Sequence, residues 1–486
     1  MPWSSDEIFQ ACVSTLEKML ETKGKDYKFP TDAIWLNMPE SANVDSNIPG
    51  TARSPQAKRL LNSGYLELTG GMAKAHTKQG AGSIRKEYRF GPKLVPPISE
   101  PTIGATSSPS ERLKDVQAAM DEDGYMITPA ELANFYLALS VSPLVILSGI
   151  SGTGKSLLPR KFAEITSAEF VPIPVQPQWS DNSDLLGYVP TLAPTTYVDG
   201  ALTESLLKAK RNPSKLVIAL LDEMNLAQVE HYFSDFLSVA ESRTRVDGEI
   251  TTDKLPLNLP SVPTENSDRC EELRNIRIPS NLRVVGTANM DESTKAFSPK
   301  VLDRAFTIEL DDPTLTDFPR PIDSDSKPVE RDRLAALASE MIQRDRAISI
   351  REAAAKSQPM FEYVAALLAE IQEILSPSGI KFGYRTRDAI LLYLHFWRQY
   401  ELQEIITGYA ALDFCILQKI LPKVVGSGEV LGDALRKLSV WLKDREIPQE
   451  GDPFPEFSGK LERCVDKVER MAALLERDGV ARFWGA

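Results

Sequence analysis

Residues 149–156 read Gly-Ile-Ser-Gly-Thr-Gly-Lys-Ser and fit the pattern G-x-x-x-x-G-K-[ST], the phosphate-binding loop of nucleoside triphosphatases. The apolar run 144–147 before it is typical of a buried parallel strand, and a helical pattern follows from Lys155. Glycines let backbone N–H groups surround a phosphate, and the helix N-terminus adds a favourable dipole. The sequence therefore predicts a strand–loop–helix unit, and it favours a phosphate site over a glycine-rich turn that holds no ligand.

Two side chains of this loop have specific chemistry. We expect Lys155 to reach the β and γ phosphates and the Ser156 hydroxyl to ligate Mg²⁺. The predicted nucleotide-binding residues of the loop are Gly149, Ile150, Ser151, Gly152, Thr153, Gly154, Lys155 and Ser156.

A second apolar strand, residues 216–221, ends in the two acids Asp222 and Glu223, which is the Walker B form. We expect Asp222 to bind both nucleotide and Mg²⁺, directly or through water, and Glu223 to orient and deprotonate the attacking water. The alternative is an acidic helix cap at a strand end. The spacing from the phosphate loop fits a neighbouring strand of one sheet and favours the catalytic interpretation.

Three further residues are catalytic candidates. Asn289 follows the apolar strand 282–288 and suits a sensor that hydrogen-bonds the attacking water or the γ-phosphate. Arg304 follows on a helix and is a candidate arginine finger, supplied to a neighbour's nucleotide, or else it forms an intrachain salt bridge. Arg385, at the start of a later helix, fits a second sensor or an ordinary surface arginine.

The length, the apolar runs and the cysteines of the chain indicate how many domains it has and where in the cell it works. A chain of 486 residues predicts two to four domains. No apolar run reaches the ~18 to 20 residues that a membrane span needs, and the acidic N-terminus lacks a signal-peptide core. The four cysteines are far apart and fit neither a disulfide framework nor a zinc site. We therefore expect a soluble cytoplasmic protein with reduced thiols and no membrane partner.

Strand and helix patterns alternate up to about residue 311 and predict an α/β fold with a parallel sheet, interrupted by a hairpin over 246–250. From about 330 the pattern is helical, with one helix over 361–375. The expected domains are a small α+β, winged-helix-like recognition module, a linker, a large α/β subdomain, an α-helical lid and a C-terminal helical extension. Their expected ranges are 1–93, 94–112, 113–329, 330–442 and 443–486.

The N-terminal module is the expected place for nucleic acid. Residues 1–100 hold 13 Lys/Arg against 11 Asp/Glu, whereas the whole chain has a net charge of −12. Helices over 6–20 and from 54, then strands 65–69 and 88–90 around a glycine-rich loop, suggest a winged helix-turn-helix. A solvated basic loop or a protein-docking module remains an equal alternative. The candidate DNA-binding residues are Lys74, Lys78, Arg85, Lys86 and Arg89.

Taken together, these motifs resemble the AAA+ superfamily and, within it, the McrB-like branch of restriction and phage-defence NTPases. The resemblance spans about residues 113–440. It rests on blocks beyond the two Walker motifs, which are 135–139, 179–188, 222–226 with 229–233, 289–292 and 298–304.

The resemblance implies a ring, with a hexamer as the expected assembly and nucleotide between subunits. It also implies an N-terminal domain that recognises DNA or another signal, and a separate McrC-like partner that carries the nuclease. The best-known members use GTP and carry M-N-x-x-D near the sensor asparagine. Glu292 stands at the Asp position here, so GTP and ATP both stay open as the cofactor, with Mg²⁺.

Three functions are compatible with these features. The first is an NTP-hydrolysing motor subunit of a McrBC-like complex that translocates DNA or activates a nuclease. The second is a MoxR-like protein-remodelling chaperone, which would need no DNA. The third is a nucleotide-gated DNA-binding switch with little turnover.

Overall fold

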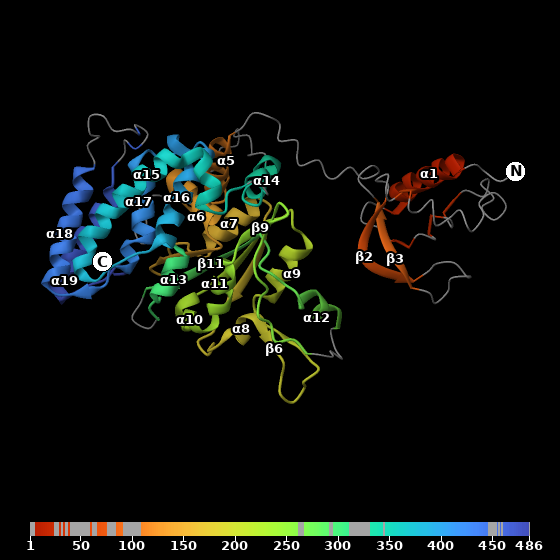
Figure 1. The fold of residues 1–486 in the computed structure, drawn as a ribbon, viewed down its shortest axis with the longest axis horizontal. Coiled ribbons are helices and arrows are strands. Elements are labelled where there is room, and N and C mark those ends of the chain that lie inside the picture. The colour runs from red at the N-terminus through yellow and green to blue at the C-terminus, as the bar shows by residue number, and fades with distance from the viewer. Residues whose placement is uncertain are drawn as a thin grey trace. The chain divides into compact units, whose positions relative to one another are not determined.

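The computed structural model of the chain falls into two compact units, Met1–Ala105 and Thr106–Ala486, and each has a sheet of its own (Figure 1). The residues that the structure describes are 5–23, 29–30, 33–34, 37–38, 59–60, 66–74, 84–90, 108–260, 267–290, 295–310, 331–343, 346–445, 454, 457 and 460–485.

The first unit combines one long helix with a three-stranded antiparallel sheet of order β1-β3-β2. Its elements are α1 (Ser5–Lys23), β1 (Phe29–Pro30), β2 (Leu66–Lys74) and β3 (Ile84–Phe90). Helix α1 buries side chains at helical spacing, among them Ile8, Cys12 and Leu16, as its sequence pattern predicts.

The hairpin strands of this unit are longer than the sequence suggests. Strand β2 runs through Gly70 and Gly71, which we expected in a loop, and its register with β3 shifts between Leu68 and Met72. A β-bulge of this kind places an extra residue in a strand, and glycine is common there. The second expected helix, from residue 54, falls within the described residues only at 59–60, which are helical.

The second unit is built on a five-stranded parallel sheet of order β12-β4-β11-β8-β5. Its strands are β4 (Leu144–Gly149), β5 (Glu169–Pro174), β8 (Val217–Asp222), β11 (Leu282–Asn289) and β12 (Phe306–Glu309). The central strands are continuous apolar runs because helices cover both faces of the sheet. The parallel α/β fold predicted from the alternating pattern is confirmed.

Alternate residues of the central strands enter two different cores. Val145 and Leu147 of β4 pack with the first three helices of the second unit and with the helical lid. Leu144 and Ile146 pack with the helices that cover the other face of the sheet. The helices of the first face are α5 (Pro109–Glu122), α6 (Pro129–Val141) and α7 (Leu157–Ile165). Those that follow β5 and β8 and cover the other face are α8 (Asn182–Leu186), α9 (Thr203–Arg211), α10 (Val229–Tyr232), α11 (Ser234–Glu241), α12 (Ser267–Leu273) and α13 (Pro299–Arg304).

Two helix starts differ from expectation. Helix α5 begins at Pro109 with a Ser108–Glu111 capping box, although we assigned 94–112 to a linker. Helix α7 begins at Leu157 rather than at Lys155. The predicted hairpin is present as β9 (Thr244–Val246) and β10 (Glu249–Thr251). A second hairpin, which we did not anticipate, joins β6 (Gly187–Tyr188) to β7 (Val198–Asp199).

Beyond β12, the described residues of the second unit are mainly helical, as the sequence predicts. Its helices are α14 (Arg331–Glu340), α15 (Ile350–Leu375), α16 (Tyr384–Gln399), α17 (Tyr409–Lys419), α18 (Glu429–Asp444) and α19 (Glu462–Asp478). Helix α15 starts eleven residues earlier than the expected 361, at a Ser349–Glu352 capping box, and it continues through Pro359. Buried residues on both sides of this proline, including Ala353 and Val364, hold the helix in the core.

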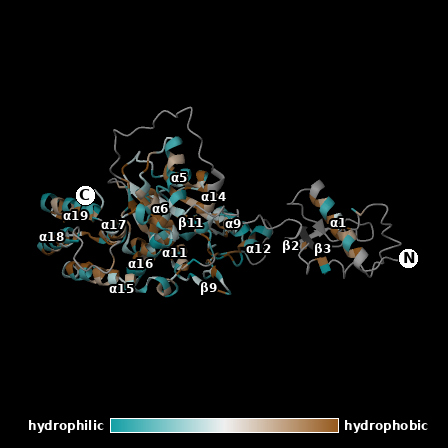
Figure 2. Ribbon diagram, turned by 90° about the horizontal axis from the view of Figure 1, so that it is seen from above, coloured by the Kyte–Doolittle hydropathy of each residue, from teal (hydrophilic) through white to brown (hydrophobic). Residues whose placement is uncertain are grey.

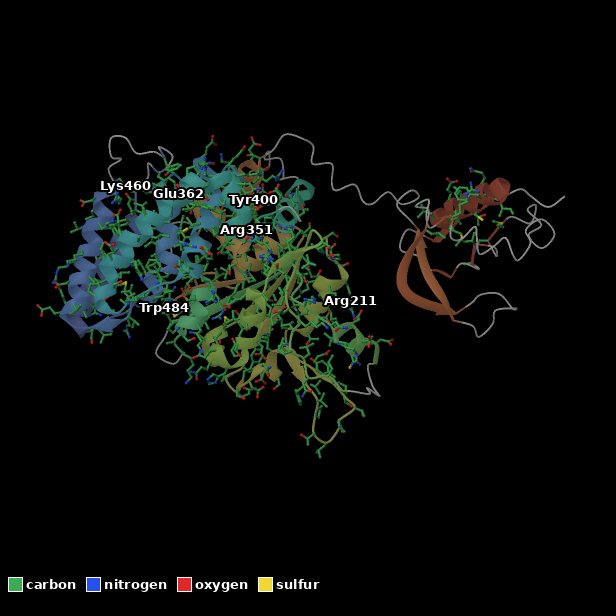
Figure 3. All side chains as sticks on the ribbon, viewed as in Figure 1. Arg211, Arg351, Glu362, Tyr400, Lys460 and Trp484 are labelled. Carbon is green, nitrogen blue, oxygen red and sulfur yellow. The ribbon has the colours of Figure 1, made fainter. Side chains whose placement is uncertain are left out.

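The C-terminal residues return to the core of the second unit. Strand β14 (Val480–Ala481) pairs with β13 (Gly426–Ser427), and the ring of Trp484, labelled in Figure 3, lies 5.9 Å from that of Phe297. Hydrophobic and hydrophilic residues interchange along α18 and α19 in Figure 2. In the described part of the chain, no helix combines the length and the apolar character needed to cross a membrane.

Candidate functional site

The phosphate-type loop joins β4 to α7 and depends on glycine for its backbone path. Gly152 and Gly154 have φ angles of 90° and 84°, a region that L-residues with a side chain rarely adopt. A Cβ built on Gly152 would meet no atom of the described residues within 4 Å, so none of them closes the loop on that side. A Cβ on Gly154 would lie 2.8 Å from the ring of Tyr125, which packs behind the loop. A loop that is open on one side and supported on the other fits a phosphate group.

Lys155 points back into this loop. Its Nζ donates hydrogen bonds to the carbonyl oxygens of Gly149, at 3.0 Å, and Ile150, at 2.5 Å, and the residue is only 6% exposed. Thr153 closes the same turn, because its Oγ1 donates to the Ile150 carbonyl at 3.0 Å. The ammonium is therefore held at the centre of the loop, which is where phosphate oxygens would bind.

The carboxylate of Asp222 lies beside the loop because strand order brings β8 next to β11 and β11 next to β4. Its Oδ1 accepts a hydrogen bond from Ser156 Oγ at 2.6 Å and another from Thr287 Oγ1 at 2.7 Å. A hydroxyl and a carboxylate oxygen at hydrogen-bond distance are a donor set that fits Mg²⁺, which takes few protein ligands and keeps several waters.

Glu223 has a strained backbone. Its φ and ψ are 54° and 49°, in the left-handed region, which costs about 1–2 kcal/mol in a residue with a side chain. Its N–H donates to Thr287 Oγ1 at 2.8 Å, and its Oε1 accepts from Asn289 Nδ2 at 3.1 Å. Strained conformations of this kind concentrate at functional sites. The predicted Asn289 and the predicted Glu223 are thus brought together.

Two residues that sequence reasoning passed over organise these groups. Thr287 links the backbone of Glu223 to the carboxylate of Asp222. Asn225, which is 1% exposed, donates from Nδ2 to the backbone carbonyl of Asn289 at 2.8 Å. Asn225 belongs to one of the blocks on which the family resemblance rests, but its role as a support for Asn289 depends on the contact between the short 3-10 helix Met224–Leu226 and the end of β11.

Arg304 lies at the opposite edge of the sheet from the loop. Its backbone carbonyl accepts a hydrogen bond from Ser142 Oγ at 3.0 Å, just before β4 begins, whereas the loop follows the end of β4 at Gly149. The strand separates the two ends by about 17 Å at the usual rise per residue. The Arg304 side chain forms an intrachain ion pair with Glu241, which was the alternative interpretation from sequence.

Arg385 shares that partner. It begins α16, and its Nη2 lies 2.9 Å from Oε1 of Glu241. The structure therefore brings Arg304 and Arg385 together, at the edge of the sheet away from Lys155. Of the basic residues in the first unit, Lys74 ends β2, while Arg85, Lys86 and Arg89 lie on β3. Lys78 and Glu292 fall outside the described residues.

Comparisons with known proteins agree with this geometry. The AAA domain family, dynein-related subfamily, matches residues 144–305, and a domain family of unknown function (DUF8727) matches 334–480. The EcoKMcrB subunit of a type IV methyl-directed restriction enzyme from Escherichia coli (strain K12) is 23% identical over 226 residues. This match covers 46% of the chain and 44% of that relative, so the chain spans less than half of the relative's length.

A solved structure from Cytophaga hutchinsonii, assigned as an ATPase, is 14% identical and covers 68% of this chain and 91% of its own, with a TM-score of 0.37. The AAA domain match spans β4, the phosphate-type loop, both acids at the end of β8, Asn289 and Arg304. Residues 144–305 therefore form an AAA domain of the P-loop NTPase type, and the chain is similar to an McrB subunit.

Proposed function

We propose that this chain is the Mg²⁺-dependent, NTP-hydrolysing ring motor of a McrBC-like restriction or antiphage defence complex. Hydrolysis would drive DNA translocation or activate a separate McrC-like nuclease subunit. The match to the EcoKMcrB subunit supports the restriction assignment, because that relative is named as part of a type IV methyl-directed restriction enzyme. The AAA domain supports nucleotide hydrolysis.

The proposed chemistry assigns one task to each group of the loop and strand ends. Lys155 would leave the carbonyls of Gly149 and Ile150 to contact the β and γ phosphates. Ser156 and Asp222 would hold Mg²⁺, which neutralises charge on the β and γ oxygens when it is bound. The cofactor is GTP or ATP.

The attacking water belongs to a second pair of residues. Glu223 would orient this water and accept its proton, with the carboxylate held by Asn289 at 3.1 Å. Asn289 would hydrogen-bond the water or the γ-phosphate from the end of β11. Because the left-handed backbone of Glu223 fixes where its carboxylate lies, little reorganisation would be needed when the nucleotide binds.

The position of Arg304 is the observation that carries the ring assignment. Arg304 lies about one strand length, roughly 17 Å, from this chain's own loop, which is too far for an arginine side chain to span. An arginine finger at that position can act only on the nucleotide of a neighbouring copy. We therefore propose a closed, hexameric ring in which each site is shared by two subunits.

The N-terminal unit is the proposed DNA-binding part. Lys74, Arg85, Lys86 and Arg89 all lie on its β2–β3 hairpin, which suits contact with a phosphate backbone. With Lys78 they are the proposed phosphate contacts. A MoxR-like remodelling chaperone would need none of them.

The test is steady-state hydrolysis of GTP and ATP over a range of protein concentrations, with the mass measured in parallel by light scattering. We expect turnover per subunit to rise as rings assemble, because assembly completes each site. Turnover that stays constant from monomer upward would contradict the shared site. Activation by protein substrates but not by DNA would favour the MoxR-like alternative.

A further inference from the structure

Three elements of the second unit meet at a single carboxylate. Helix α11 ends at Glu241, α13 ends at Arg304, and α16 begins with Tyr384 and Arg385. Both arginines contact the same oxygen, Oε1 of Glu241. The sequence identifies the two arginines as catalytic candidates, but nothing in it distinguishes Glu241 from other surface acids.

The backbones that carry the two arginines are tied together by lysines of the lid. Lys423 Nζ contacts the carboxylate of Asp303, next to Arg304, and donates to Thr386 Oγ1, next to Arg385, at 2.6 Å. Lys419 Nζ donates to the carbonyls of Leu302, Asp303 and Ala305 at the end of α13, at 3.3, 2.9 and 2.6 Å. The backbone segments around Arg304 and Arg385 are therefore fixed. The direction in which each arginine side chain points depends on the contacts of its own guanidinium group.

Glu241 is the main contact that orients the two guanidinium groups, because it carries the opposite charge. Arg304 Nη1 also donates to the carbonyl of Lys300 at 2.8 Å, but Glu241 is the only carboxylate that the described residues place against either guanidinium. One carboxylate neutralises one of two positive charges, so the group carries a net charge of +1. The side chains of Arg304, Arg385 and Glu241 are 21%, 47% and 32% exposed, so a further anion has access.

We propose that Glu241 is a positioning residue that holds Arg304 and Arg385 side by side as one receptor for the terminal phosphate of a nucleotide on the adjacent subunit. The proposal rests on the shared site proposed above and names the residue that prepares it. Glu241 does not touch the nucleotide; it acts through the arginines. Without its carboxylate, two neighbouring guanidinium groups repel each other, and the pair no longer points to one place.

The first variant is Glu241→Gln, which keeps the shape and removes the charge. We expect turnover of the assembled protein to fall about 10-fold to 100-fold, because small misplacements of positioned groups have effects of that size. The dissociation constant for nucleotide should stay the same, since Lys155 and Ser156 lie at the other edge of the sheet. Glu241→Asp should recover part of the loss.

A matched control is available in Glu169, at the start of β5. It is also shared by two cations, Lys208 at 2.7 Å and Lys215 at 3.4 Å, and its side chain is 33% exposed. Glu169→Gln should leave turnover unchanged. A general effect of removing a shared carboxylate would lower turnover in both variants and would overturn the proposal.

A double-mutant cycle with Arg304→Ala and Arg385→Ala separates positioning from a structural role. Once both arginines are removed, Glu241→Gln should cost little further turnover, because it acts only through them. A full, additive loss in that background, or a lowered melting temperature that accounts for the lost activity, would overturn the proposal.

The same cycle distinguishes failure of this inference from failure of the shared site. If Arg304→Ala and Arg385→Ala each lower turnover but Glu241→Gln does not, the shared site stands and the role of Glu241 is wrong. If neither arginine variant changes turnover of the assembled protein, the shared site itself is wrong and the positioning role falls with it.

Discussion

Thr287 donates a hydrogen bond from its Oγ1 to Oδ1 of Asp222 at 2.7 Å, across the boundary between strands β11 and β8. The same hydroxyl oxygen accepts the N–H of Glu223 at 2.8 Å. One threonine thus fixes the two acids on which the proposed chemistry depends, the first through its carboxylate and the second through its backbone.

Replacing Thr287 by valine should therefore impair catalysis without changing the shape of the strand. The variant leaves the Glu223 N–H without its partner, and Asp222 loses one of its two donors. The lost hydrogen bonds correspond to about 1–2 kcal/mol of stabilisation, so we expect turnover to fall by about 10-fold. The Mg²⁺ concentration that gives half-maximal activity should rise.

The control for this variant is Thr307→Val on strand β12. Thr307 is as buried as Thr287, at 1% against 2% exposed, but its hydroxyl has no hydrogen-bond partner among the residues that the structure describes. This substitution should leave turnover and Mg²⁺ dependence unchanged. Equal effects of the two variants would mean that burial, and not the bridge to the acids, explains the loss.

Glu223→Gln should separate binding from hydrolysis. Glutamine has the shape of glutamate, so it fits the left-handed backbone position and can still accept the hydrogen bond from Asn289. It cannot accept a proton from the attacking water. We expect turnover to fall by about 100-fold or more, with nucleotide affinity preserved in a fluorescence titration. Asp222→Asn should instead weaken Mg²⁺-dependent nucleotide binding. Normal turnover in Glu223→Gln would remove the assignment of this residue as the base.

Stability should depend on pH through the buried Lys419. Burial, reinforced by Lys423 and Arg385 and opposed by Asp303, lowers the pKa of Lys419 from 10.5 to about 7. Between those values the unfolded chain binds more protons than the folded one, so the stability contributed by this group rises with pH over that window. The slope reaches about 1.4 kcal/mol per pH unit.

Lys419→Met removes the titrating group. From pH 7 to pH 9, the free energy of unfolding of the unmodified protein should rise relative to that of the variant, by up to about 3 kcal/mol. Denaturant titrations at several pH values measure the difference. Parallel pH profiles for the two proteins would show that Lys419 keeps its ordinary pKa, with the three carbonyls of α13 stabilising its ammonium.

The hairpin of the first unit should bind DNA through phosphates. Replacing its basic residues by alanine should weaken DNA binding and reduce the slope of affinity against salt concentration, by about one for each phosphate contact that is lost. The residues to change together are Lys74, Lys78, Arg85, Lys86 and Arg89. An unchanged affinity and salt slope would refute the DNA-binding role.

A charge-matched control comes from exposed basic residues of the second unit. Their replacement removes the same formal charge from the chain and should leave DNA affinity nearly unchanged. Suitable positions are Lys114, Lys215, Lys443, Lys460 and Arg470.

The sequence predicts those parts of the fold that depend on local pattern. The apolar strand 144–147, the loop after it and the acids at 222–223 are short, ordered signals, and the parallel sheet follows from their alternation with helices. Local pattern defines the ends of these elements less well. The sequence predicts a helix over 361–375, yet α15 starts at Ile350 and passes through Pro359 because both flanking segments are buried in the core.

The supporting residues could not be found in this way, for a physical reason. A threonine inside an apolar strand is common, and Thr287 gains its role only because β11 lies between β4 and β8. Glu241 is one of 68 acidic residues, and its importance depends on three helix ends that are distant in sequence. Contacts of this kind follow from strand order and helix packing, which a local pattern does not specify.

The central claim is that each nucleotide site is completed by Arg304 of a neighbouring subunit, and mixing two inactive variants tests it most directly. Arg304→Ala keeps its own loop and Glu223, while Glu223→Gln keeps Arg304, so a mixed ring contains interfaces with a full set of groups. Neither variant alone should hydrolyse nucleotide well, and steady-state turnover should recover when they are mixed, with a maximum at intermediate ratios. No recovery at any ratio, with mixed rings confirmed by mass, would contradict the claim.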